Sequence, residues 1–173
     1  RNVWKDILGY DIKEFYYDYS NYITPIATSD TNYSTLLPIF RQTNLAAELY
    51  GININTEYLF NNELSVNSNI SYTIGKQSVS EDNLPLIPPL SINITVNYKL
   101  DDWYFNINTK MATSQEKTGQ LENRTDGYVV LNAEIKKNID LGGNMLALML
   151  NLKNITNQVY SNHLSRIKSV YPQ

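Results

Sequence analysis

The stretch Leu90-Ser91-Ile92-Asn93-Ile94-Thr95-Val96-Asn97-Tyr98 decides the fold of this chain, because apolar and small polar residues alternate through it without a break. Successive side chains of an extended strand point to opposite faces, so the pattern predicts a strand with one apolar and one neutral polar face. The same alternation runs through 63–75 and continues from Trp103 to Met111. It predicts an antiparallel, all-β sheet over most of the chain.

The predicted strands are separated by connections that alternate in length. We expect about seven strands, near 9–23, 38–60, 63–75, 88–100, 103–113, 127–139 and 144–156. Tight turns are predicted at Asn61-Asn62, Asp101-Asp102 and 141–143, where the residues tolerate hairpin geometry. Longer polar segments lie at about 24–37, 76–89, 114–126 and from 158 onward. Short turns on one side and long loops on the other are typical of an outer-membrane β-barrel.

Three further features favour a barrel over a soluble β-sandwich, which also alternates. The polar face carries Asn, Ser and Thr where a soluble sheet usually carries charge. Some predicted strands exceed the usual five or six residues. Aromatic residues gather toward strand ends, as membrane-interface girdles require, at Tyr22, Tyr58, Phe60, Tyr72, Tyr98, Trp103 and Tyr128. The side chains expected to face lipid include Leu90, Ile92, Ile94, Val96, Phe105, Ile107, Leu148 and Leu150.

Composition excludes several other classes of protein. The chain of 173 residues has no cysteine, so disulfides and thiolate metal sites are impossible. Its net charge of -3 disfavours nucleic acid as a partner. No apolar run reaches the ~18 residues of a membrane helix. The chain begins Arg1-Asn2-Val3-Trp4, without a signal peptide, so we expect either a processed protein or an internal fragment.

The need to close a barrel favours an internal fragment over a complete processed protein. Seven consecutive antiparallel strands cannot close a large barrel, and an open edge in lipid would leave backbone groups without hydrogen-bond partners. We therefore expect this chain to form only part of a barrel.

Several short motifs, taken in order, resemble the C-terminal part of TonB-dependent outer-membrane receptors. They are Phe40-Arg41-Gln42-Thr43-Asn44-Leu45-Ala46-Ala47-Glu48-Leu49-Tyr50-Gly51, the Pro-Pro segment 84–90, Asp126-Gly127-Tyr128 with Leu131-Asn132, and the closing segment 152–160. His163-Leu164-Ser165-Arg166 is similar to a subgroup that includes zinc and copper receptors. The resemblance covers nearly the whole chain.

The resemblance implies that 1–173 is the C-terminal portion of a receptor barrel in the outer membrane of a Gram-negative cell. The resemblance further implies a plug domain, a TonB-contacting box and a final strand, and we expect all three to lie outside residues 1–173. The implied function is TonB-dependent active uptake of a scarce nutrient, with an iron siderophore or another metal complex as the first choice. The implied partners are outer-membrane lipid, TonB through the plug, and the nutrient, with no cofactor and no enzymatic activity. A passive porin-like or lipid-transport barrel and a secreted carbohydrate-binding β-sandwich remain open as alternatives.

Few residues suggest a binding site, and none suggests a catalytic one. His163, the only histidine, lacks ligand partners at clean metal spacing, so a structural role competes with metal binding. Arg166 could bind an anionic siderophore or a lipid headgroup, or it could make a strand-end salt bridge. Glu116, Glu122 and Asp126 share one predicted outer loop and could contact a cationic substrate. The carboxylate pairs Glu81-Asp82 and Asp101-Asp102 fit solvated loop and turn charges.

Overall fold

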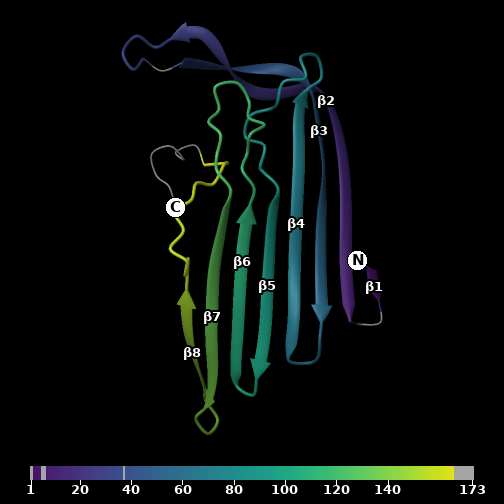
Figure 1. Ribbon diagram of the computed structural model, residues 1–173, viewed down its shortest axis with the longest axis vertical. Helices are drawn as coiled ribbons and strands as arrows, with labels where there is room; N and C mark the ends of the chain where they lie inside the picture. The colour runs from purple at the N-terminus through teal and green to yellow at the C-terminus, as the bar shows by residue number, and fades with distance from the viewer. Residues whose placement is uncertain (1, 5–6, 37, 166–173) are drawn as a thin grey trace.

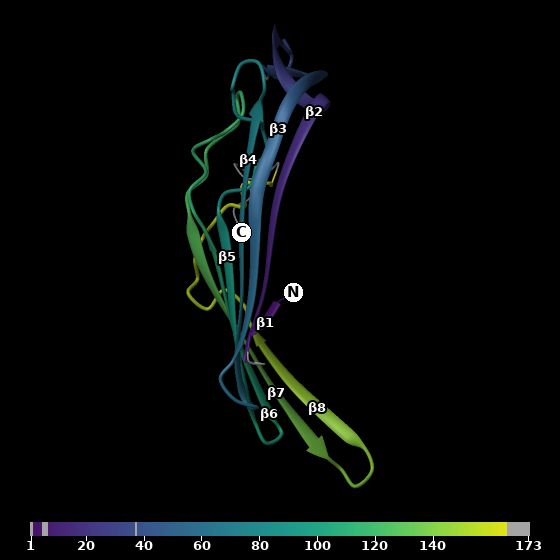
Figure 2. The same cartoon turned by 90° about the vertical axis from the view of Figure 1, so that its right-hand side faces the viewer.

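The computed structural model describes residues 2–4, 7–36 and 38–165, which form one antiparallel sheet with its strands in chain order (Figure 1). The strands are β1 Asn2–Trp4, β2 Leu8–Thr31, β3 Pro38–Leu59, β4 Leu64–Gln77, β5 Ser91–Leu100, β6 Trp103–Ala112, β7 Tyr128–Asp140 and β8 Met145–Leu152. Each strand pairs with the next along the chain, which confirms the predicted up-and-down topology. The sheet is bent rather than flat (Figure 2). No helix in the described part of the chain is long and apolar enough to cross a membrane.

The first long connection is shorter than predicted, because β2 continues through most of it. A loop was expected from about residue 24, but β2 extends to Thr31 and pairs with the start of β3. This pairing resumes after a register shift between Tyr19 and Tyr22. The polar residues of this segment are typical of a loop. The segment nevertheless stays extended, because the adjacent β3 backbone supplies its hydrogen-bond partners. The chain then reverses at Asn32, whose side-chain oxygen accepts hydrogen bonds from the Ser34 and Thr35 amides.

The last strand is shorter than predicted, and a short first strand was missed. β8 ends at Leu152 rather than near residue 156. Asn154 and Asn157 both have a φ of 49°, the left-handed conformation that Asn tolerates better than most residues and that ends a strand. The Asn154 side-chain oxygen also accepts a hydrogen bond from the Gln158 amide at 2.9 Å. β1 has only 3 residues, too few for alternation to reveal.

Register places the alternating residues in rows that differ sharply between the two faces. The pairs Ile54↔Ile70, Ile70↔Ile92 and Ile92↔Met111 make one row across four strands. The next residue on each strand gives the row Asn55, Asn69, Asn93 and Lys110 on the other side. We call the side with Ile92 the apolar face and the side with Asn93 the polar face. All the predicted lipid-facing residues within the strands lie on the apolar face, namely Ile92, Ile94, Val96, Phe105, Ile107, Leu148 and Leu150.

Aromatic side chains border the apolar face at both ends, although two of the predicted girdle residues lie elsewhere. Near the short turns stand Tyr58, Phe60, Tyr98, Trp103 and Phe105, several of them in ring contact. Near the long loops Tyr16 packs on Tyr50 with ring centroids 6.4 Å apart. Tyr22 instead packs against the buried cluster around Ala47, and Tyr128 packs on Tyr160. Both cover the base of loop structure, so strand-end position alone does not identify a girdle residue.

The sheet has almost no core of its own. Among the described residues, the buried hydrophobic side chains are Ala47, Leu84, Ile87 and Val130. On the apolar face, Ile107 is 48% exposed and Leu148 is 54% exposed. A β-sandwich would cover such side chains with a second sheet, but the described strands form one sheet, so the sandwich alternative is wrong. An apolar surface of this extent needs a non-aqueous environment.

Ile94 gives a direct test of that environment, because it lies on the apolar face in the middle of β5. In the complete protein folded into phospholipid vesicles, Ile94→Arg should lower the free energy of unfolding by about 2–4 kcal/mol. The matched control is Thr95→Arg, which places the same charge on the polar face one residue away. Urea titrations of both variants measure the difference. Equal effects of the two substitutions would place Ile94 away from lipid.

Candidate functional site

Much of the polar face is built from neutral side chains that hydrogen-bond across neighbouring strands. The Asn69 amide donates to the Asn55 side-chain oxygen at 2.8 Å, and the Asn106 amide donates to Asn97 at 2.7 Å. Asn108 likewise donates to the Thr95 hydroxyl at 2.9 Å. Each amide can form more than one hydrogen bond, so further donors and acceptors remain for water or a polar solute. The face is therefore wettable, and charged residues such as Asp11, Glu57 and Lys110 stand among the neutral ones.

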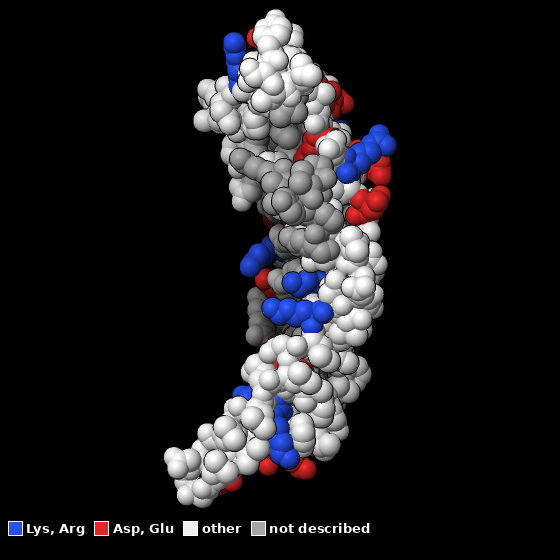
Figure 3. Space-filling view, turned by 90° about the vertical axis from the view of Figure 1, so that its left-hand side faces the viewer, with Lys and Arg blue, Asp and Glu red and all other residues white. Residues whose placement is uncertain are grey.

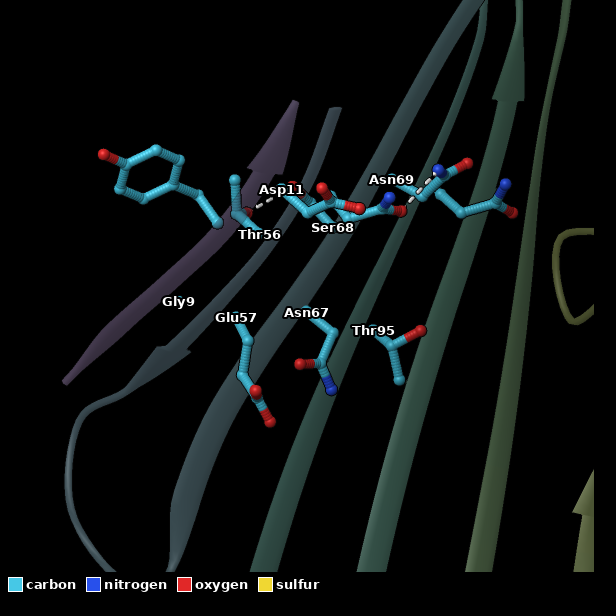
Figure 4. Close-up of a pocket in the computed structure, with 11 residues that line it drawn as sticks. Gly9, Asp11, Thr56, Glu57, Asn67, Ser68, Asn69 and Thr95 are labelled. Carbon is cyan, nitrogen blue, oxygen red and sulfur yellow. Dashed lines mark hydrogen bonds between the residues drawn. The ribbon is translucent and has the colours of Figure 1, made fainter. Parts of the chain in front are cut away.

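A shallow hollow of about 440 Å³ lies over this face between β2 and β5 (Figure 4). Figure 4 shows the Asn69–Asn55 hydrogen bond on this face. The Thr56–Ser68 hydrogen bond of 2.7 Å, also drawn there, joins two side chains in the row of Ile94 on the apolar face. Two carboxylates line the hollow: Asp11, which pairs with Lys13 at 3.2 Å, and Glu57. The remaining lining residues are Gly9, Tyr10, Asn55, Thr56, Asn67, Ser68, Asn69, Asn93 and Thr95. These amide, hydroxyl and carboxylate groups suit water or a hydrophilic solute.

At the other end of the strands, the loop between β4 and β5 folds back onto the sheet. Leu84 and Ile87 are buried against Ala47 of β3 and Gly75 of β4. A Cβ atom on Gly75 would lie 2.6 Å from Cδ1 of Ile87, so a larger residue here would require the Ile87 side chain to shift. The Gln115 side chain, itself buried, donates to the Ile87 carbonyl at 2.8 Å and ties the next loop to the first.

Glu122 connects this loop to two others through its carboxylate. Its oxygens accept hydrogen bonds from the Leu86 amide at 3.1 and 3.2 Å and from the Gly119 amide at 3.0 Å. One of them also lies 3.1 Å from Nε2 of His163. Nδ1 of His163 lies 2.9 Å from the Thr125 hydroxyl, in a residue that is only 2% exposed. We call Glu122, Thr125 and His163 the loop brace, because together they join residues 78–90, 113–127 and 153–165.

The structure brings together two of the five site residues predicted from the sequence. Glu122 and His163 meet in the loop brace. Glu116 is exposed and pairs with Arg124 at 3.0 Å, and Asp126 is exposed on the same loop. Arg166 lies outside the described residues. Substrate contact by these residues stays a prediction.

Sequence reasoning missed the partners of His163. Thr125 is an ordinary polar loop residue in the sequence, and neither its spacing from His163 nor that of Glu122 marks a contact. Only the folding of three loops over one end of the sheet brings them together. In the described part of the chain, no group of three or more His, Asp or Glu side chains could hold a metal ion.

Known proteins resemble the chain in sequence pattern and in fold. The family model for the "TonB dependent receptor-like, beta-barrel" matches residues 6–155. The copper transporter OprC aligns with a TM-score of 0.81 at 18% identity, over 92% of this chain and 25% of its own. The ferric citrate transporter FecA, in its unliganded form, gives 0.71 at 19% identity, over 98% of this chain and 27% of its own. The pyoverdine outer-membrane receptor FpvA from Pseudomonas aeruginosa PAO1, bound to pyoverdine, gives 0.66 at 11% identity, over 91% and 25%.

These likenesses have a limited reach. No curated protein matches the chain by sequence. At identities below a fifth, the solved structures show a shared fold and nothing about the ligand. The chain spans about a quarter of the length of these solved structures.

The loop brace predicts a local loss of stability when its carboxylate is removed. Glu122→Ala would leave the Leu86 and Gly119 amides without their acceptor. Gly119 is buried, where an unpaired amide typically costs about 1–3 kcal/mol, whereas Leu86 is exposed and water can replace part of the loss. Amide hydrogen exchange at these two positions should accelerate accordingly. Glu116→Ala is the matched control, because it removes a carboxylate of the same loop from an exposed ion pair worth about 0–1 kcal/mol. Unchanged exchange in the Glu122 variant would show that the brace does not hold the loops.

Proposed function

We propose that this chain forms part of the wall of a receptor for active nutrient uptake across a Gram-negative outer membrane. The chain belongs to the TonB-dependent receptor-like β-barrel family. Members of this family are transporters rather than enzymes, and they are outer-membrane proteins. The observation that carries the proposal is the family match over residues 6–155 on a single-layer sheet with one apolar and one polar face. The apolar face would contact lipid and the polar face would line the lumen.

We further propose that 1–173 is the C-terminal portion of the barrel. The described sheet is open, with β1 and β8 at its two edges. In lipid these edges need further strands, because unpaired backbone groups are too costly there. A plug domain with a TonB-contacting box would precede Arg1, and a closing strand would follow Gln173. This chain aligns with only 25% and 27% of the lengths of OprC and FecA, which supports a longer receptor.

The proposed substrate is a metal complex, with an iron siderophore as the first choice. Support comes from the described cargo of similar folds, which includes copper, ferric citrate and pyoverdine. Within this chain, we assign substrate contact to the exposed Glu116 and Asp126 of the loop between β6 and β7. Glu122 and His163 would hold that loop in place from beneath. A metal-bearing or otherwise cationic group on the substrate would favour such carboxylates.

Uptake measurements on the full-length receptor test the proposal. The receptor would be expressed in a Gram-negative host that lacks its own metal receptors, in strains with and without TonB. The probes are ferric citrate, a ferric hydroxamate chelate and Cu²⁺, each radiolabelled. We expect saturable accumulation of one probe that requires TonB and an energised inner membrane. Equal accumulation without TonB would instead indicate a passive porin-like barrel.

Loop carboxylates give a second test, on the substrate side. In a receptor that takes up one of these probes, the double change Glu116→Gln and Asp126→Asn should weaken binding of that probe. The expected loss is roughly fivefold, as for two partly screened surface charges. Asp82→Asn is the control, since Asp82 is an exposed carboxylate on the neighbouring loop. Equal losses from Asp82→Asn and from the double variant would assign the effect to general charge.

A further inference from the structure

Lys137 is an unusual residue for its position, because it stands on the apolar face. The register pairs Trp103 with Lys137 and Lys137 with Leu148, and Trp103 also pairs with Leu100. The row therefore reads Leu100, Trp103, Lys137 and Leu148 across four strands. The adjacent row, toward the strand centres, is Tyr98, Phe105, Ile135 and Leu150. Lys137 thus carries the only charge within these two rows of apolar and aromatic side chains.

The Lys137 ammonium is held by an aromatic ring rather than by a carboxylate. Nζ lies 4.5 Å from the centroid of the Trp103 ring, within the range of a cation–π contact. Among the residues that the structure describes, Lys137 makes no ion pair. The acidic residues of the adjacent turns have other surroundings: Asp140 accepts hydrogen bonds from the Gly142 and Gly143 amides, and Asp101 and Asp102 are exposed at the β5–β6 turn. The charge of Lys137 is therefore available to an outside anion.

The length of the apolar face places Lys137 at the border of the membrane. From Trp103 to Met111, β6 rises roughly 27 Å at about 3.4 Å per residue. A strand tilt of about 40° reduces this to a height of roughly 21 Å, close to the ~25 Å apolar band of membrane barrels. Trp103 and Lys137 would then stand at the headgroup level on the side of the short turns. Charged groups gather in a few places on the view from the β8 side, with wide uncharged areas between them (Figure 3).

We propose that Lys137 and Trp103 form a binding site for the phosphate group of an anionic phospholipid, in the leaflet on the side of the short turns. The ammonium would pair with the phosphate, and the indole N–H would donate a hydrogen bond to the headgroup. The acyl chains would lie along Phe105, Ile135 and Leu150, which continue the apolar face toward its centre. This site rests on the membrane placement of the proposed function and adds a specific lipid partner to it.

The neighbouring lysine supplies a matched control of the same charge. Lys136 points to the polar face, where its ammonium and that of Lys99 lie 5.5 and 5.6 Å from the Tyr104 ring centroid. Lys136→Gln and Lys137→Gln therefore remove equal charge at adjacent positions on opposite faces of the sheet. Only the Lys137 variant should affect a lipid on the apolar face.

Native mass spectrometry of the full-length receptor, titrated with phosphatidylglycerol or phosphatidylcholine in detergent, tests the site. We expect Lys137→Gln to weaken phosphatidylglycerol binding about fivefold, the effect of one lysine at a charged lipid surface. Lys137→Arg should restore binding, and Lys136→Gln should bind like the parent. Trp103→Phe, which keeps the ring and removes the N–H, should give an intermediate loss.

The site would be overturned by parental binding of Lys137→Gln, by an equal loss from Lys136→Gln, or by no preference for phosphatidylglycerol over phosphatidylcholine. Displacement of the lipid by inorganic phosphate would also overturn it, because it would show a phosphate site without lipid recognition. Heat-modifiable migration on gels verifies that each variant forms a barrel. A receptor that transports its nutrient but fails these lipid tests contradicts this site alone. A receptor absent from the outer membrane contradicts the proposed function as well.

Discussion

Backbone hydrogen bonding between successive strands is the interaction on which the rest of this structure depends. Every strand pairs with its chain neighbour, and the pairing runs without a break through ten consecutive residue pairs between β5 and β6. Because side chains alternate across a sheet, this pairing assigns each residue to a face. A slip of one residue would exchange Asn93 with Ile94 and mix the two faces. The apolar and polar faces therefore exist only in this register.

The two ends of the sheet serve different purposes. At the short-turn end, aromatic rings and Lys137 border the apolar face. At the long-loop end, most of the buried residues hold loops in place. Leu84 and Ile87 pack on the sheet, and the loop brace joins three connections. A protein with a one-layer wall has no central core to position its loops. Here the packed cluster of Leu84 and Ile87 and the carboxylate of Glu122 hold the loops in position instead.

Much of the wall could be predicted from the sequence, whereas the loop structure could not. Alternation within a single segment is enough to predict a strand, so the residues around Ile92 and Ile94 predicted both their strand and the face of each side chain. Turns at Asp101-Asp102 and 141–143 were equally local, and Asp101, Gly142 and Gly143 do adopt positive φ values. The extension of β2 to Thr31 depends on a partner strand, which the polar sequence of that segment does not reveal. The contact between Glu122 and His163 depends on three loops folding together, and no sequence pattern encodes it.

The central claim is that one face of this sheet meets lipid and the other meets water. The chain contains no cysteine, so single cysteines can be introduced in turn along β5, as Asn93→Cys, Ile94→Cys, Thr95→Cys and Val96→Cys, and labelled with an environment-sensitive fluorophore. Quenching by brominated phospholipids in the full-length receptor then reports which positions contact acyl chains. Strong quenching at 94 and 96 with weak quenching at 93 and 95 is the result that this account predicts. Uniform quenching, or the opposite phase, would contradict it.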